Sequence, residues 1–458
     1  MGGREKWMRE IRAQTRLAVP VVALQLGLMA MGIVDSAFLG RVDAVQFAAS
    51  AIANSYSFLF LAIGMGAMTM LDPLVSQAFG ARDFPAIARA LRRGLVLAMV
   101  LCVLVALPVL PAHWALTRLG QPADVVEVAA PFTHVLLVGF PPFLAFIAFR
   151  QVLQAMHLLR PLLFCVFFTN LLNVGLDWML IGGHLGAPAM GALGSAWATV
   201  ASRWMMVLLL PLVAGEDLMR VLRIPVRGIF DSRALGRMLR LGLPIGVQWF
   251  GEIGAFASVA VMMGNLGEVD LAGHQVAMTL ASTSFMVPLG ISMAASIRVG
   301  NAIGRGDPVG ARASARVGLL AGVGVMLCFG ALFLLVPGIL ARLLTDLPAV
   351  LAVAATLVPL AGLFQVFDGT QVVAVGILRG IGDTRVPMLL HLVGFWGLAI
   401  PLGWWLAFVR PDPLGATGLW YGLIAGLALV AVCQFARLRI LLMRDLQRIV
   451  IDSTAGEA

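Results

Sequence analysis

Six ionisable side chains interrupt apolar stretches of this sequence that are as long as membrane spans. A charge in the hydrocarbon core of a bilayer costs about 2.5–3.5 kcal/mol on insertion scales, so buried ionisable groups usually pair with one another or line a path for ions or substrates. They are therefore the first candidates for chemistry. The set comprises Asp35, Asp72, Asp177, Arg203, Glu252 and Asp368.

Asp35 and Asp177 stand toward the ends of two such stretches. Asn173 and Asp177 are four residues apart and share one helix face. A carboxylate beside an amide oxygen suits a hard cation such as Na⁺, or a shuttled proton. By depth, Asp35 could meet this face. The alternative is that each acid caps a helix end at the membrane interface.

Glu252 and Asp368 stand near the middle of two later stretches. Gln365, Asp368 and Gln371 are three residues apart and form a polar stripe, with Phe364 beside it. Carboxylates next to aromatic rings suit a cationic, aromatic ligand. The alternative is a polar contact between helices.

Asp72 and Arg203 are assigned more modest roles. Asp72 precedes a proline near the end of its stretch, which favours a structural role. Arg203 is expected to pair with an acid or with helix carbonyls, and the sequence leaves that partner open.

The elements that carry these residues are predicted to be membrane helices. The 458 residues are 60% hydrophobic and only 12% charged, against about 45–50% apolar in soluble proteins, so lipid must cover most of the surface. A span needs about 20 mostly apolar residues. Twelve runs qualify, which predicts an all-α integral membrane protein: 17–39, 50–78, 94–112, 131–156, 161–182, 191–214, 241–264, 271–297, 315–343, 350–378, 386–408 and 415–436.

The positive charges predict the orientation of these helices. With the N-terminus in the cytoplasm, 27 of the 32 Lys and Arg fall in cytoplasmic segments and four fall outside. This bias predicts a multi-pass protein of the cell inner membrane with both termini cytoplasmic. The apolar run after the basic N-terminus, from Leu17 to Leu39, is too long for the apolar part of a signal peptide and carries Asp35, so it is interpreted as a membrane helix and not as a cleaved signal.

An internal repeat relates the two halves of the chain. Three pairs of segments match at one constant offset, which is the distance in sequence from Leu17 to Leu241. They are 17–20 with 241–244, 80–83 with 304–307, and 191–194 with 415–418. Matching features fall on the same helix number and membrane side, which predicts parallel repeats. The predicted organisation is an N-terminal lobe (1–214), a cytoplasmic linker (215–240) and a C-terminal lobe (241–458). The acids at Asp35 and Glu252 do not follow the offset.

Several functions are not supported by the sequence. It contains no Gly-rich phosphate-binding loop with its lysine, so ATP is not expected as a ligand. The basic residues are clustered between apolar runs, which indicates topology and not nucleic-acid binding. No catalytic motif or clustered catalytic set is visible, so an enzyme is not expected, nor is a cofactor.

Five short motifs stand out along the chain: Val34-Asp-Ser-Ala-Phe-Leu-Gly40, Ala272-Gly-His-Gln-Val-Ala277, Ser296-Ile-Arg-Val-Gly300, Gly304-Arg-Gly-Asp307 and Leu378-Arg-Gly380. Together they resemble motifs of the multidrug and toxic compound extrusion (MATE) transporters, of the NorM-like branch. The resemblance covers nearly the whole chain. It implies two six-helix lobes and ion-driven export of cationic, hydrophobic compounds.

The resemblance also implies roles for individual residues. Asp35, Asn173, Asp177 and Thr199 are similar to the cation site of the N-terminal lobe, with Na⁺ or a proton as the coupling ion. Glu252 and Asp368 are similar to acids of the C-terminal lobe that are linked to ion or substrate binding. Phe364 stands where related proteins use a tyrosine, so this chain lacks that hydroxyl. The candidate substrate-binding residues are Asp35, Glu252, Phe364, Gln365 and Asp368.

We therefore expect a secondary antiporter for small cationic compounds, acting as a monomer in the lipid bilayer. A flippase for lipid-linked precursors, which shares the broader fold, is the alternative. It would need a cationic central cavity, whereas the predicted core is acidic.

Overall fold

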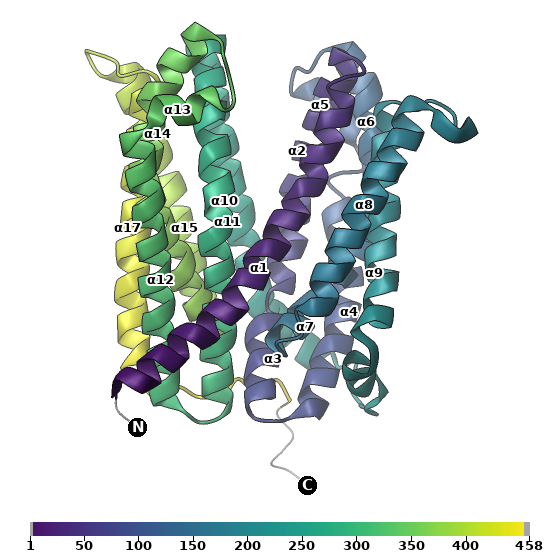
Figure 1. Cartoon of the computed structure of the whole chain (residues 1–458), viewed down its shortest axis with the longest axis vertical. Helices are drawn as coiled ribbons and strands as arrows, with labels where there is room; N and C mark the ends of the chain where they lie inside the picture. Colours follow the sequence, from purple (N-terminus) through teal and green to yellow (C-terminus); the bar gives the residue numbers. More distant parts are fainter. Residues whose placement is uncertain (1–2, 453–458) are drawn as a thin grey trace. The chain divides into compact units, whose positions relative to one another are not determined.

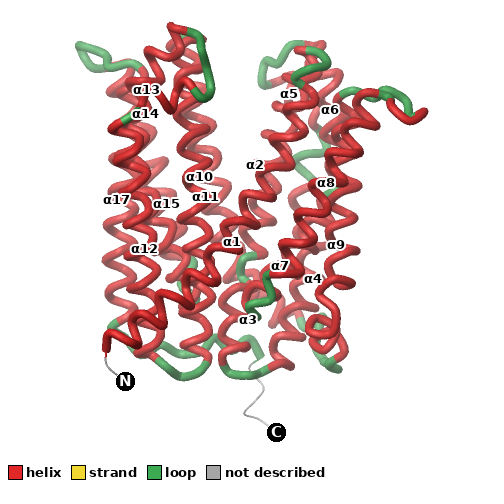
Figure 2. The backbone as a smooth tube through the Cα atoms, in the orientation of Figure 1, coloured by secondary structure: helices red, strands yellow, loops and turns green. Residues whose placement is uncertain are grey.

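The computed structural model describes residues 3–452, and all regular secondary structure in that range is helical (Figure 2). This confirms the predicted all-α class. The chain divides into two compact units. Figure 1 colours the helices in sequence order, from purple at the N-terminus to yellow at the C-terminus.

Two long helices, α1 (Gly3–Leu39) and α10 (Ser232–Leu266), are each divided between the two units. Among the described residues, the N-terminal unit comprises residues 23–246 and 450–452. The C-terminal unit comprises residues 3–22 and 247–449. The two crossing points are related by the offset of the sequence repeat, and each follows a proline within its helix, Pro20 or Pro244.

In the N-terminal unit α8 packs closely on α9. Helix α2 packs mainly on α6, and α4 packs mainly on α7. Pro141 at the start of α7 follows Gly139, where the α6–α7 pair bends by 46°. Its helices are α2 (Ala44–Met68), α3 (Leu71–Gly80), α4 (Phe84–Ala106), α5 (Ala112–Arg118), α6 (Ala123–Val138), α7 (Phe140–Ala155), α8 (Arg160–Gly182), the short η1 (His184–Gly186) and α9 (Ala192–Arg223).

The C-terminal unit is centred on α14, which packs against α11, α12 and α17. Its core is an apolar cluster that includes Phe364, Phe395 and Trp420. Its remaining helices are α11 (Glu268–Gly304), α12 (Pro308–Leu335), α13 (Pro337–Arg342), α14 (Pro348–Ile381), α15 (Arg385–Leu392), the π-helical η2 (Val393–Ala399), α16 (Ile400–Trp404), the π-helical η3 (Trp405–Val409) and α17 (Ala416–Leu442).

The helices account for the predicted membrane spans. Among the described residues, nine helical segments are long and apolar enough to cross a bilayer, and the bent α6–α7 pair makes a tenth. Helices α4 and α9 overlap the two remaining predicted runs, 94–112 and 191–214. The predicted linker at 215–240 is largely helical, because α9 continues to Arg223 and α10 begins at Ser232. The division into lobes at that linker stays a prediction.

Equivalent turns in the two halves have the same structure. Before α4, the N–H of Ala86 donates to the Asp83 carboxylate (3.0 Å), and before α12 the N–H of Gly310 donates to Asp307 (2.8 Å). Such a side-chain cap satisfies a free N–H at a helix start. The offset of the sequence repeat relates both members of these pairs, so the repeat extends to local hydrogen bonding.

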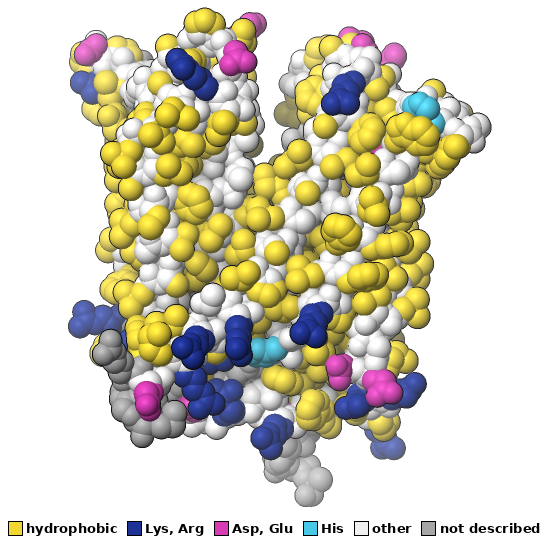
Figure 3. Space-filling model, viewed as in Figure 1, with side chains coloured by type: hydrophobic (Ala, Val, Ile, Leu, Met, Phe, Trp, Pro, Cys, Tyr) yellow, Lys and Arg dark blue, Asp and Glu magenta, His cyan; other side chains and the backbone are white. Residues whose placement is uncertain are grey.

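Side chains on the surface agree with a membrane environment. Figure 3 shows hydrophobic side chains over most of the visible face, with most Lys and Arg gathered toward the end at which α1 begins. Large apolar side chains such as Phe167 (72% exposed), Leu212 (78%) and Leu335 (79%) point outward. Contiguous exposed apolar surface of this kind is expected where lipid is the solvent.

Candidate functional site

The N-terminal unit brings three helices together around Asp35. Asp35 lies near the end of α1, Asn173 and Asp177 lie one turn apart on α8, and Thr199 lies on α9. The four side chains predicted to form a cation site are therefore neighbours in the structure. We call them, together with Ser195 and Arg203 of α9, the Asp35 cluster.

Close packing of α8 on α9 positions this cluster. Gly194 of α9 lies directly against the backbone of α8, where an added Cβ would stand 2.6 Å from the Leu180 carbonyl oxygen. Gly191, which precedes α9, has φ +55°, a conformation that glycine adopts without strain. Gly418 and Gly415 repeat both features in the C-terminal unit. The contact fixes the rotation of α9 against α8, and with it the direction of the Thr199 side chain.

The carboxyl, amide and hydroxyl groups of the cluster are buried, and Arg203 is half-buried. The Thr199 hydroxyl donates to Asp35 Oδ2 at 2.8 Å. Asn173 and Asp177 are fully buried, and Asp35 and Thr199 are 8% and 7% exposed. Asp177 and Asn173 also lie within side-chain hydrogen-bonding reach of Asp35, and Ser195 lies within reach of Asp177.

This set of atoms fits a proton or a hard monovalent cation. Two carboxylates accept hydrogen bonds and cannot donate to each other unless one is protonated. Carboxylate, hydroxyl and amide oxygens are also the ligands that hard cations prefer. Because two adjacent buried carboxylates repel each other, the arrangement favours a bound positive species.

Arg203 is the member of the cluster whose partner the sequence left open. Its guanidinium lies over the Phe143 ring, 4.7 Å from the ring centre, and interacts electrostatically with Asp35. Ser195, which lies beside Asp177, was also missed. Ser195, Thr199 and Arg203 are spaced by four residues, so a polar stripe on α9 was the signal available in the sequence.

A cavity of about 510 Å³ opens beside this cluster within the N-terminal unit. Its wall includes Asp35, Thr199 and Arg203 together with the aromatic and apolar side chains Phe140, Phe143 and Met206. A pocket that is mostly apolar with a few convergent polar groups is the usual form of a small-molecule site. The carboxyl group of Asp35 therefore belongs both to the buried cluster and to the wall of the cavity.

The C-terminal unit holds a second buried acid cluster. Glu252 of α10 interacts electrostatically with Asp368 and with Arg379, both of α14. Gln371 donates to Asp368 Oδ1 at 3.1 Å, as the predicted polar stripe requires. Asp368 is 6% exposed. The Arg379 guanidinium lies 5.9 Å from the centre of the Trp249 ring.

His391 belongs to this second cluster and was not identified from the sequence. Its Nε2 lies 4.0 Å from Glu252 Oε2, and the ring is almost fully buried. The amide nitrogens of Gln248 and Gln434 lie 3.1 Å and 2.8 Å from its ring nitrogens, and the Pro387 carbonyl oxygen lies 3.0 Å from Nδ1. The ring is therefore held in one orientation beside Glu252.

Two predicted substrate-binding residues occupy packed positions. Gln365 donates to the Ala281 carbonyl (2.8 Å) and to the Ser284 hydroxyl (2.6 Å), which joins α14 to α11. Phe364 is 2% exposed and packs edge-on against Phe256 and Trp420. Whether either residue contacts a substrate stays a prediction.

Asp72 lies outside both clusters. It is buried within the N-terminal unit and interacts electrostatically with Arg150, which also donates to the Gln25 side chain (3.1 Å). This arrangement agrees with the structural role inferred from the sequence.

The fold and the two clusters define a helical membrane protein in which each unit surrounds buried acids. The MatE family model matches residues 20–179 and 244–405, two segments whose starts are related by the offset of the sequence repeat. The chain is 34% identical to the probable multidrug resistance protein NorM of Agrobacterium fabrum, with 97% of each chain covered. It is 33% identical to the multidrug resistance protein MdtK of Pectobacterium atrosepticum, with 97% and 99% covered.

Solved structures share the fold. The eukaryotic MATE transporter AtDTX14 superposes with a TM-score of 0.88 at 22% identity, with 96% of this chain and 97% of that chain covered. An outward-facing MATE family multidrug resistance transporter gives 0.85 at 20% identity, with 95% and 96% covered. The chain belongs to the MatE family, and the resemblance seen in the sequence motifs is confirmed.

Replacing Gly194 with alanine should disturb the contact that positions the Asp35 cluster. The added methyl group would meet the α8 backbone, and overpacking of this kind costs about 1–3 kcal/mol. We expect Gly194→Ala to lower the melting temperature of the purified protein in a fluorescence-monitored thermal scan. Gly175→Ala on α8, where an added Cβ meets nothing within 4 Å, is the control. Equal melting temperatures for both variants would contradict the proposed role of the contact.

Proposed function

We propose that the protein is a secondary antiporter that exports cationic, hydrophobic small molecules across the cell inner membrane, driven by inward movement of protons or Na⁺. We further propose that both termini are cytoplasmic, that the transporting unit is a monomer, and that the Asp35 cluster is a coupling site. The names of the NorM and MdtK relatives, both described as multidrug resistance proteins, support the choice of substrate class.

The charge balance of the Asp35 cluster is the observation that carries the proposal. Asp35 and Asp177 are two neighbouring carboxyl groups, and Arg203 offsets the charge of one of them. Two carboxylates at one buried site cannot both stay ionised without a compensating positive charge. The remaining negative charge therefore calls for one proton, one Na⁺ or one cationic group of a substrate.

Exchange follows if these positive species compete. Asp35 faces the cavity and also contacts Thr199 in the buried cluster, so a cation bound at either place neutralises the same carboxylate. Binding of one species must then weaken binding of the other by the same factor. The apolar and aromatic wall of the cavity selects a hydrophobic cation over a hydrated inorganic one.

The inward concentration gradient of the coupling ion supplies the driving force. Exchange of one proton or one Na⁺ for one monovalent cation moves no net charge, so the membrane potential adds its contribution of about 2.3 kcal/mol per 100 mV only when more charge enters with the ions than leaves with the substrate. The gradient can drive export only if ion binding and drug binding are mutually exclusive. The shared carboxylate provides this exclusion without a nucleotide.

We assign the Glu252 cluster a second coupling or substrate role in the C-terminal unit. It repeats the composition of the Asp35 cluster, with two carboxyl groups and one arginine stacked on an aromatic ring. His391 would position Glu252 and could exchange a proton with it. A flippase for lipid-linked precursors is less well supported, because the cavity beside Asp35 is lined by one acid and one arginine instead of a cationic surface.

Asp35→Asn should leave the protein folded and stop coupled export, because the amide keeps the shape but cannot be neutralised by a cation. The measurement is efflux of a fluorescent cationic dye from proteoliposomes under separate proton and Na⁺ gradients. Asp124→Asn, at an exposed position in the first turn of α6, is the matched control and should transport normally. Gradient-driven efflux by Asp35→Asn at the control rate would refute the coupling role.

Arg203 tests the charge balance independently. Arg203→Lys keeps the positive charge but loses the planar contact with Phe143, whereas Arg203→Gln removes the charge and leaves two uncompensated acids. We expect Arg203→Gln to lower dye efflux several-fold more than Arg203→Lys. If both variants lose the same activity while remaining folded, Arg203 acts through its shape and packing and the charge argument fails.

A further inference from the structure

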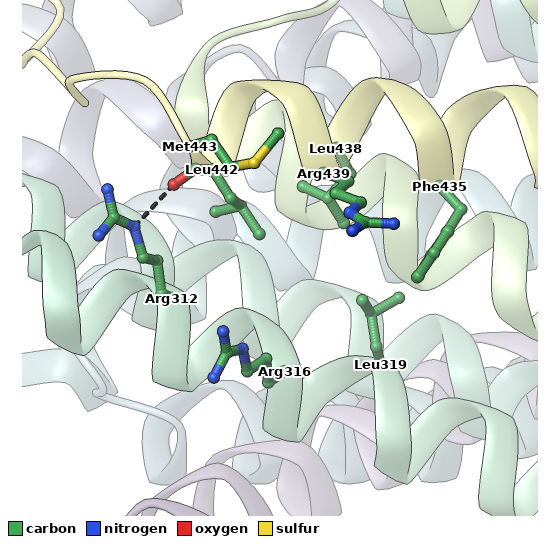
Figure 4. Close-up of a pocket in the computed structure, with 8 residues that line it drawn as sticks. All are labelled: Arg312, Arg316, Leu319, Phe435, Leu438, Arg439, Leu442 and Met443. Carbon is green, nitrogen blue, oxygen red and sulfur yellow. Dashed lines mark hydrogen bonds between the residues drawn. The ribbon is translucent and has the colours of Figure 1, made fainter.

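A groove lined by basic and apolar side chains lies between α12 and α17, away from both acid clusters. It has a volume of about 550 Å³ and is lined by Arg312, Arg316 and Leu319 of α12 and by Phe435, Leu438 and Arg439 of α17 (Figure 4). Both helices belong to the C-terminal unit, and the groove lies where α12 begins and α17 ends.

The three arginines of this groove have no acidic partner among the described residues. No Asp or Glu lines the groove, and within residues 3–452 none of the three forms an ion pair. Arg312 is fixed through its Nε, which donates to the Leu442 carbonyl oxygen at 2.6 Å (Figure 4). Its two terminal nitrogens take no part in that bond.

Neighbouring arginines of the same unit behave differently. Arg298 pairs with Glu10, and Arg437 pairs with Asp383 at 2.8 Å. These two are explained by contacts within the protein. The concentration of charge in the groove has no such explanation. Three guanidinium groups that line one groove favour an anion with several oxygens, such as a phosphate group.

The groove continues onto an apolar surface. Phe435 is 48% exposed, and next to it along the helices Val432 and Leu320 are 64% and 62% exposed. These side chains belong to helices that are long and apolar enough to cross the bilayer. A ligand that fits both parts has an anionic head and a hydrocarbon tail.

We propose that this groove binds the phosphodiester headgroup of an anionic phospholipid of the cytoplasmic leaflet, with an acyl chain lying along Phe435, Val432 and Leu320. Basic pockets between membrane helices on the cytoplasmic side are suited to such headgroups. The assignment to that leaflet rests on the proposed orientation of the termini. A lipid bound here bridges α12 and α17.

The test is native mass spectrometry of the full chain released from nanodiscs that contain phosphatidylglycerol and phosphatidylcholine. We expect the wild type to retain phosphatidylglycerol and the Arg316→Gln, Arg439→Gln variant to retain several-fold less. The matched control is Arg305→Gln, Arg444→Gln, which removes the same charge from exposed positions outside the groove. Control and wild type should retain lipid equally.

Three outcomes would overturn the proposal. Undiminished retention by the groove variant would remove the site, and equal loss in both double variants would reduce it to general surface attraction. Displacement of the lipid by millimolar inorganic phosphate would identify a phosphate-ion site instead. If the double variant does not fold, Arg439→Gln alone provides the same comparison. Because dye efflux by these variants is not the readout, failure here is separate from failure of the antiport proposal.

Discussion

The cost of a charge in a low-dielectric interior is the constraint on which this structure depends. The Asp35 cluster places two buried carboxyl groups beside a partly buried guanidinium, and the Thr199 hydroxyl donates to one carboxylate oxygen. Two carboxyl groups at such a site favour a bound positive species. The α8–α9 contact, the glycine at its centre and the aromatic ring under Arg203 hold these side chains in place.

The helical scaffold follows the sequence repeat, whereas the buried acids do not. The scaffold repeats at a constant offset, from the capping aspartates before α4 and α12 to the glycines that begin α9 and α17. Among the acids, Asp35 and Glu252 stand at different positions on the equivalent helices α1 and α10, and Asp177 and Asp368 lie on α8 and α14, which the offset does not relate. Each unit nevertheless has two acids and one arginine beside an aromatic ring. The two clusters therefore share a composition although their acids occupy non-equivalent positions.

Much of the fold was predictable because membrane helices have a strong sequence signal. Apolar runs, the arginine bias and the constant offset identified the helices and the repeat, and the family motifs brought Asp35, Asn173, Asp177 and Thr199 together. Contacts between helices were less accessible, because they depend on how each helix is rotated. The partner of Arg203 and the position of His391 beside Glu252 are of this kind. Gln365 illustrates the reverse case, since its spacing suggested a binding stripe and its amide is used to join α14 to α11.

Competition between the coupling ion and the substrate is the central claim, and one equilibrium measurement tests it most directly. Binding of a fluorescent monovalent cation to the purified protein is titrated at a series of proton concentrations and, separately, of Na⁺ concentrations. If one negative charge is shared, the apparent dissociation constant rises about tenfold for each tenfold increase of the coupling ion once the ion concentration is well above its own dissociation constant, and Asp35→Asn removes that dependence. Dye affinity that is independent of both ions in the wild type would contradict the account.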